Sequence, residues 1–205
     1  MISAKSRALL ERMRPTIESA SPDEIARAVN ANELSPWRDG PLALAHDGSF
    51  RAFFAPLDWI NDDADIIIVG VTPGKQQALE ALLTFRNTLK EGCSIEDAAR
   101  RAKAAASFKG GMRTLGARLM DHFGLHKVFG LETTLDLFGR AAARARYTSA
   151  LRYPVIKKFQ NYSGDRRIAK LPFMKRMIET HLAEEIAALP KAWIVPFGPT
   201  APARS

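Results

Sequence analysis

The chain has 205 residues, of which 46% are hydrophobic and 25% are charged. This composition is ordinary for a globular protein and excludes disordered and collagen-like classes. The length suits one domain with a sizeable core, so we expect a single domain over residues 1–205, with a helical N-terminal extension at 1–40 and an α/β core at 60–205. The net charge of +8 is typical of a chain that binds a polyanion.

Residue usage excludes several other classes. No apolar run approaches the roughly 20 residues that a membrane helix needs, and the N-terminus contains no signal-peptide core. The single cysteine, Cys93, cannot form an internal disulfide, and the four histidines show no zinc-ligand spacing. We therefore expect a cytoplasmic, monomeric protein with no membrane partner, no metal and no cofactor.

The first part of the chain predicts two helices, a hairpin and a buried strand. Residues 4–19 have helical spacing, and a second helix is expected to begin after Ser21 as its N-cap. Two apolar stretches around Asp47-Gly48 predict a hairpin. Residues 66–71 lack polar alternation, which is typical of a central parallel strand buried on both faces.

The rest of the chain alternates helices and strands. Helices are expected at 75–90, after Ser94, up to Gly124, at 134–138 and, most clearly, at 172–189. Strands are expected at 145–155, where Pro154 excludes a helix, and at 192–198, where the apolar run indicates a buried strand. This alternation predicts an α/β layered fold with a largely parallel sheet. Ligands of such folds lie past the carboxyl ends of the strands, which would bring together the turns at 70–77 and 149–164 and the segment after Gly198.

The sequence DIIIVGVTPGKQQ, residues 65–77, contains the first of these turns. A phosphate-binding P-loop needs four residues between its glycines, followed by Lys and then Ser or Thr. Here Gly70 and Gly74 enclose three residues, and Lys75 is followed by Gln76, so the match fails in length and in the metal ligand. A dinucleotide fingerprint fails as well, because no third glycine follows at the required offset. The glycines and Pro73 instead suit close approach of the backbone to a flat base or a sugar phosphate.

Basic residues gather in two segments of the chain. The first contains Arg100, Arg101, Lys103, Lys109, Arg113 and Arg118, and the second contains Lys157, Lys158, Arg166, Arg167, Lys170, Lys175 and Arg176. Each segment is either a surface that binds the phosphates of a nucleic-acid backbone or a solvated helix face or loop.

Three segments together resemble the uracil-DNA glycosylase superfamily. The strand, Gly-x-x-Pro-Gly turn and helix around Gly70–Gly74 resemble its first motif, YTSALRYP at 147–154 is similar to its central strand, and AWIVPFGPTAP at 192–202 resembles the strand and Gly-x-x-Ala turn before its last loop. The resemblance covers roughly residues 60–205. It implies a three-layer sandwich, DNA as the partner, and an enzyme that hydrolyses the N-glycosidic bond of a damaged base flipped out of the duplex.

The resemblance also implies roles for particular residues. Thr72 stands where many members have the Asp or Asn that orients or activates water, although a hydroxyl cannot take a proton from water at neutral pH. Thr148 or Ser149 stands at the position of the base-reading Asn. The residues expected against the base or the DNA backbone around the first turn are Gly70, Val71, Pro73, Gly74, Lys75 and Gln76.

Other family features are replaced or not found in this sequence. The family's final His-Pro-Ser loop is not found before Ser205, and none of the four histidines falls at its position. Phe85 lies at about the distance of the family's stacking aromatic, but its helical pattern predicts core packing. We assign catalysis to no histidine.

The segment NYSGDRR, residues 161–167, supplies further candidate contacts. Tyr162 offers a ring for stacking, the backbone amides of Ser163 and Gly164 can approach a phosphate, and Arg166 and Arg167 supply charge. The alternative is a polar turn with a half-buried tyrosine.

Three functional interpretations follow from these patterns. The first is a divergent DNA glycosylase that uses Thr72 to position water. The second is a DNA-binding or nucleobase-binding protein on the same fold without hydrolysis. The third is a small-molecule enzyme on a generic α/β scaffold, since fold does not fix function.

Overall fold

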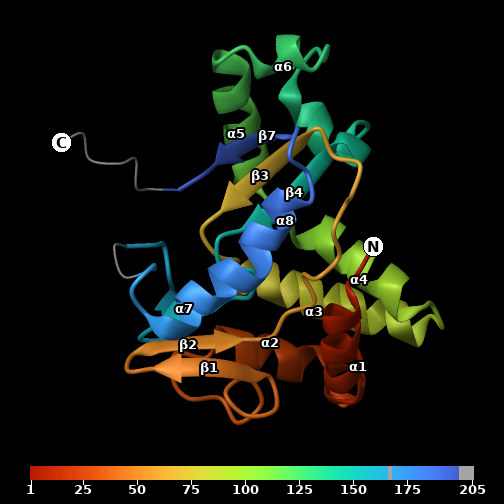
Figure 1. Cartoon of the computed structure of the whole chain (residues 1–205). Helices are drawn as coiled ribbons and strands as arrows, with labels where there is room; N and C mark the ends of the chain where they lie inside the picture. The colour runs from red at the N-terminus through yellow and green to blue at the C-terminus, as the bar shows by residue number, and fades with distance from the viewer. Residues whose placement is uncertain (166–167, 199–205) are drawn as a thin grey trace.

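The structure, a computed structural model, describes residues 1–165 and 168–198 (Figure 1). It is a mixed α/β protein, as the sequence predicts. Its α-helices are α1 (Ala4–Ser19), α2 (Pro22–Asn30), α3 (Lys75–Lys90), α4 (Ile95–Ala106), α5 (Gly111–His122), α6 (Leu125–Val128), α7 (Pro172–Met177) and α8 (Ala183–Ala187). Its strands are β1 (Ala43–Asp47), β2 (Phe50–Phe53), β3 (Ile66–Gly70), β4 (Ala145–Ser149), β5 (Val155–Lys157), β6 (Gln160–Asn161) and β7 (Trp193–Pro196).

The predicted helix starts are confirmed by their capping contacts. The Ser21 hydroxyl accepts a hydrogen bond from the Glu24 amide at the start of α2, and the Ser94 hydroxyl accepts one from the Asp97 amide at the start of α4. Each contact satisfies an amide that would otherwise lack a partner in the first turn. Gly92, with φ at +81°, follows the end of α3 in the left-handed conformation that glycine adopts without strain.

The central strand of the parallel sheet is β3. The strand order is β4-β3-β7, with Ile66 opposite Ala145 on one side and Trp193 on the other. Residues 66–69 are buried, which confirms a strand covered on both faces. The chain passes from β3 to β4 on one side and later to β7 on the other, so the direction of winding reverses beside β3. Ligands of α/β sheets usually bind at such a point.

The second sheet is antiparallel, with strand order β1-β2-β5-β6. Its first hairpin confirms the strands predicted around Asp47-Gly48, but the turn itself is Gly48-Ser49. The reason is that Asp47 still pairs with Phe50 at the end of the ladder. In Figure 1 this hairpin lies with α1 and α2 at one end of the molecule, and β3, β4 and β7 lie with α5 and α6 at the other.

The predicted strand at 145–155 is divided between the two sheets. β4 ends at Ser149, the amide of Leu151 donates to the Val71 carbonyl, and β5 begins at Val155 in the antiparallel sheet. The described strands therefore form one parallel and one antiparallel sheet, instead of the single largely parallel sheet that we predicted. The segment 150–154 connects β4 of the parallel sheet to β5 of the antiparallel sheet.

Two hydrophobic cores hold these layers. The larger core joins the N-terminal helices with α3, α4, β2 and β5, and it contains Leu10, Ile25 and Phe85, all fully buried. The core position predicted for Phe85 is thus confirmed. The smaller core lies against the parallel sheet and contains Ile68 and Met120. Among the described helices, none is long and apolar enough to cross a bilayer.

The closing elements differ from the sequence prediction. The predicted helix at 172–189 is interrupted by a π-helical turn, Ile178–Leu182, between α7 and α8. The prediction of a buried strand at 192–198 is wrong for β7, where Trp193 is 54% and Ile194 47% exposed. The physical reason is that β7 pairs with β3 alone among the described strands, so it forms an edge of the sheet and only part of it faces the smaller core.

Candidate functional site

A cavity of about 390 Å³ opens at the carboxyl ends of β3, β4 and β7. We call it the strand-end pocket. Apolar side chains form most of its wall, and they come from α4, α5, the segment between them and the sheet. Its lining residues include Leu57, Val71, Ala106, Phe108, Met112, Leu115, Leu119, Tyr147 and Phe197.

Two glycines from later parts of the chain, Gly164 after β6 and Gly198 after β7, approach Val71 at the end of β3. A Cβ added to Gly164 would lie 3.0 Å from the Val71 Cγ1, and one added to Gly198 would lie 3.1 Å from its Cγ2. Gly164 also has φ at +94°, a conformation in which other residues are strained. The first turn and the segment 149–164 therefore do meet there, with Gly198 beside them, while the segment expected after Gly198 lies outside the described residues.

The first turn is closed by contacts within the chain. The Asn161 side chain accepts a hydrogen bond from the Lys75 amide at 2.8 Å, and the Gln77 side chain accepts one from the Gly74 amide at 3.0 Å. These acceptors cap the amino end of α3, where an anion would otherwise bind. The turn therefore does not act as a phosphate-binding P-loop, as its sequence indicated. Asn161 holds the start of α3 in place, a role that the sequence did not reveal.

Two predicted contact residues of the first turn point elsewhere. The Lys75 ammonium donates to the carbonyls of Asn30 and Ala31 at the end of α2, so it is engaged inside the chain rather than presented to a DNA backbone. Gln76 is exposed and is not part of the pocket wall, whereas its neighbour Gln77 is. The predicted contact residue was therefore one position too early in the chain. Of these two glutamines, the first turn of α3 directs only Gln77 toward the pocket.

The Thr72 hydroxyl lies in the pocket wall but is engaged with the backbone. It donates to the Tyr153 carbonyl at 3.0 Å and accepts from the Val155 amide at 3.1 Å. Its single hydrogen is therefore already used, and a hydroxyl cannot act as a base at neutral pH. The contacts make Thr72 a link between the first turn and β5 rather than a group that activates water.

The other predicted residues divide into those that reach the pocket and those that do not. The pocket is lined by Gly70, Val71, Thr72, Pro73, Thr148, Ser149, Tyr162 and Ser163, but Gly74, Lys75, Gln76 and Gly164 stand outside its wall. Arg166 and Arg167 lie outside the described residues.

Tyr162 is a core residue. It is 5% exposed, its ring meets Phe50 edge-on at 5.5 Å, and its hydroxyl contacts Asp165. The prediction of a stacking surface at Tyr162 is therefore wrong, because the ring is already packed. Tyr162 still borders the pocket, together with Phe197, Phe108 and Tyr147, and the centroids of the last two lie 6.2 Å apart.

Phe108 adopts an unusual backbone conformation. Its φ is +49°, in the left-handed region that bulky side chains rarely enter. Its ring packs against Phe138 and Phe197 as well as Tyr147, with centroids about 6 Å apart. Three rings of this aromatic cluster, those of Phe108, Tyr147 and Phe197, form part of the pocket wall.

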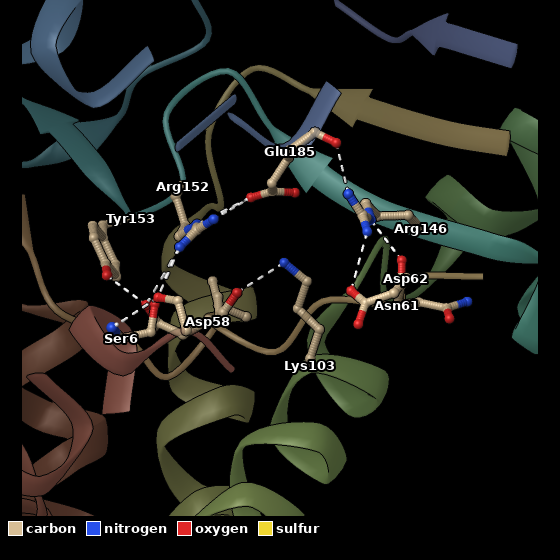
Figure 2. A network of polar contacts seen from close by, with 11 residues as sticks. Ser6, Asp58, Asn61, Asp62, Lys103, Arg146, Arg152, Tyr153 and Glu185 are labelled. Carbon is tan, nitrogen blue, oxygen red and sulfur yellow. Dashed lines mark hydrogen bonds and ion pairs between the residues drawn. The ribbon is translucent and has the colours of Figure 1, made fainter. Parts of the chain in front are cut away.

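A buried polar network underlies the strand-end pocket (Figure 2). Glu185 from α8 accepts hydrogen bonds from Arg152 through both the Nε and Nη2 atoms of the guanidinium. Asp58 accepts one from the Tyr153 hydroxyl at 2.6 Å and lies 3.7 Å from the Arg152 guanidinium. Burial raises the pKa of Asp58. Burial alone would raise the pKa of Glu185 too, but Arg152 and Lys103 outweigh it and lower that pKa.

Arg146 is a further cation of this network, and its guanidinium contacts oxygen atoms. It donates to the carbonyls of Asn61 and Glu185, each at 2.7 Å, and lies 3.4 Å from Asp62. Figure 2 shows it on β4, beside Glu185 and away from Asp58.

Lys103 and Thr148 belong to this network and also line the strand-end pocket. Lys103 is 8% exposed, and its ammonium donates to the Leu57 carbonyl at 2.9 Å. Burial lowers the pKa of Lys103 to about 8, against the opposing effect of Glu185. The Thr148 hydroxyl is buried, approaches Glu185 and helps lower its pKa, yet it falls short of a regular hydrogen bond within the described residues.

Sequence reasoning missed Lys103, Arg152 and Glu185 as site residues. A signal for Lys103 was present: it falls on the same helical face as Ala99, Ala102 and Ala106, so periodicity alone places a cation on the buried side of α4. Arg152 follows a buried strand directly. Glu185 gave no such signal, because its inward direction depends on the π-helical turn before it.

The histidines and the first basic segment have other roles. His181 packs edge-on against Tyr153, and burial lowers its pKa to about 4. Arg100, Arg101 and Lys109 pair with acidic side chains, and Arg113 donates to backbone carbonyls. Most of this segment is therefore engaged within the chain.

The fold and pocket define a mixed α/β protein with a ligand-sized site at the reversal of its parallel sheet. The chain is 30% identical over 164 residues to the uncharacterized protein YoxB of Bacillus subtilis (strain 168). The alignment covers 78% of this chain and 64% of the relative, so the chain spans less than two thirds of that protein's length. No family model and no solved structure matches the chain.

Proposed function

We propose that the strand-end pocket binds a single planar ring of nucleobase size. The observation that carries this proposal is the convergence of three strand-end turns on a cavity of about 390 Å³ with apolar walls. Small-molecule sites commonly have volumes of roughly 300–1,000 Å³, with a few polar groups that fix orientation. Here Lys103 on α4 and Thr148 and Ser149 at the end of β4 supply polar groups, and the rings of Phe108, Tyr147 and Phe197 line the same cavity.

The segments that resemble the uracil-DNA glycosylase superfamily are the ones that line this pocket. They supply Gly70–Pro73, Thr148-Ser149 and Phe197-Gly198. On this basis we infer a divergent relative of that superfamily with its sandwich fold, and DNA as the source of the ring. DNA binding should weaken as salt rises, because released counterions drive such association.

Thr72 favours binding over hydrolysis. A water-positioning role needs a free hydrogen-bonding group directed at the ring, and the Thr72 hydroxyl is bonded to Tyr153 and Val155 instead. Because the described pocket wall contains no carboxylate, a general base of the usual kind is not among those residues.

Hydrolysis of an N-glycosidic bond is the second candidate. The observation that favours it is the buried Lys103 ammonium in the pocket wall, since a fixed positive charge steadies negative charge on a departing base. Duplexes that carry uracil, hypoxanthine or no lesion, followed by alkaline cleavage, test it. Abasic sites formed by the wild type and lost in Lys103→Met would establish hydrolysis, whereas salt-sensitive binding without abasic sites would leave binding as the function.

Ring binding is tested by calorimetric titration with uracil and hypoxanthine. We expect both rings to bind the wild type, and Leu115→Trp, which fills the pocket mouth from an exposed position, to weaken binding by ~10-fold or more. Leu34→Trp is the matched control, because Leu34 is also exposed but lies outside the pocket. Equal affinity in both variants would contradict the proposal. Ring binding without any DNA affinity would instead indicate a small-molecule protein.

A further inference from the structure

The buried cations around the strand-end pocket are not equally paired with carboxylates. Arg152 is matched by Glu185 and Asp58, and Arg146 is matched by Asp62 and two carbonyls. Lys103 is different: in the described part of the chain its one hydrogen-bond acceptor is the Leu57 carbonyl, and no carboxylate lies within ion-pair distance. A buried cation without a paired anion is costly for the folded state.

Lys103 and Arg152 both line the pocket, but the Arg152 guanidinium is already paired with Glu185 and Asp58. Lys103 lines the cavity together with Thr148 and Ser149, at the end where β4 stops. An ammonium has three donors, so two remain after the bond to Leu57. The Thr148 hydroxyl adds a buried group without a regular partner.

The remaining polar side chains of the pocket wall do not compete for this position. Gln77 bonds to the Gly74 amide and the Ala106 carbonyl, and Ser107 donates to the Lys103 carbonyl. Thr72 is bonded on both sides as described above. The Lys103 ammonium and the Ser149 hydroxyl therefore remain as donors in a cavity whose wall is mostly apolar.

We propose that the ring bound in this pocket carries an anionic edge, and that this edge lies against the Lys103 ammonium and the Ser149 hydroxyl. The ligand class is a planar heterocycle that is either ionised in the ring or substituted with a carboxylate. This inference rests on the proposed ring binding and adds the charge of the ligand. The bound anion would place a negative charge beside the Lys103 ammonium, which has no carboxylate within ion-pair distance among the described residues.

The test compares three ligands of the same shape class by calorimetry at neutral pH: uracil, which is uncharged, 5-nitrouracil, which is ionised in the ring, and orotate, which carries a carboxylate. We expect at least one anionic ligand to bind the wild type ~10-fold or more tightly than uracil. Preference for 5-nitrouracil identifies an ionised ring edge, and preference for orotate identifies a carboxylate.

Two variants locate the effect. Lys103→Met removes the charge from a similar shape and should abolish the preference for the anion. Arg100→Met should preserve it, because Arg100 lies on the same helix but lines the neighbouring cavity of about 250 Å³ and not the strand-end pocket. A preference that survives Lys103→Met would overturn the inference.

The pH dependence of the wild type gives a test that needs no variant. Lys103 is surrounded by Asp58, Arg146, Arg152 and Glu185, and it loses its proton as pH rises through about 8. Affinity for the anionic ligand should therefore be highest below that pH and fall above it, whereas affinity for the neutral ring should not follow this profile. If uracil binds as well as the anions do, the inference fails and ring binding stands. If no ring binds, ring binding itself fails.

Discussion

Thr72 uses its hydroxyl to join the first turn to the start of β5. It donates to the Tyr153 carbonyl and accepts from the Val155 amide, so the hydroxyl satisfies two backbone groups at once. The sequence correctly placed Thr72 at the pocket but gave it a role in positioning water, because the family comparison aligns positions and does not reveal hydrogen-bond partners. At this position the side chain contributes structure.

We predict that Thr72→Val lowers the free energy of unfolding by about 2 kcal/mol, because it leaves a carbonyl and an amide without their partner. Urea unfolding followed by circular dichroism measures the change. Thr72→Ser keeps the hydroxyl and should recover most of the stability. A valine variant as stable as the wild type would show that these backbone groups find other partners.

Lys103 makes the stability of the protein depend on pH in the alkaline range. Its pKa is lowered from 10.5 to about 8 in the folded state, so between these values the unfolded chain binds the proton that the folded chain releases. Stability attributable to this residue therefore rises with pH across that window. The rise is about 3 kcal/mol, from 1.36 kcal/mol for each pKa unit.

Lys103→Met should lack this alkaline rise. Urea unfolding of both proteins at the two ends of the window gives the change in the free energy of unfolding of each. The contributions of the other titrating groups cancel when the two changes are subtracted. The wild type should gain about 3 kcal/mol more than the variant as pH increases from about 8 to 10.5. Identical pH dependence in the two proteins would mean that the pKa of Lys103 is not lowered.

At the scale of single elements, local signals in the sequence identified most helices correctly. The Ser21 and Ser94 caps and the stop at Gly92 are determined by neighbouring residues, so periodicity and capping chemistry suffice to find them. The exposed edge of β7 and the π-helical turn before Glu185 could not be found in this way. They depend on which elements pack alongside, and a single sequence pattern does not contain that information.

The cap of α3 by Asn161 joins two elements that are far apart in the sequence. Its side chain accepts from the Lys75 amide at 2.8 Å, across 86 positions of the chain. We predict that Asn161→Ala lowers the free energy of unfolding by about 1 kcal/mol, the usual value of an N-terminal helix cap. It should also speed hydrogen exchange at the Lys75 amide.

The control for this cap is Asn87→Ala, because Asn87 is exposed on the same helix and contacts only the neighbouring Arg86 side chain through its amide oxygen. Its variant should exchange at Lys75 like the wild type. Unchanged exchange in Asn161→Ala as well would show that the cap does not hold the first turn.

At the scale of the whole molecule, the pocket follows from topology. The winding reverses beside β3, and the turns after β3, β4 and β7 close around one cavity, which is why the sequence could predict where the site lies. The polar network beneath it was not predictable. It combines α4, α8 and the segment after β4, and its contact between Ser6 and Arg152 spans 146 positions, so it exists only once the fold is complete.

The central claim, that the strand-end pocket binds a planar ring, is tested most directly by mapping backbone chemical shifts of the isotope-labelled protein during titration with orotate and uracil. We predict that the shifts concentrate at 70–73, at Thr148-Ser149 and around Lys103, and that Leu115→Trp suppresses them. Shifts centred on the neighbouring cavity at Trp59 and Ala142, or no saturable shifts with either ring, would contradict the account.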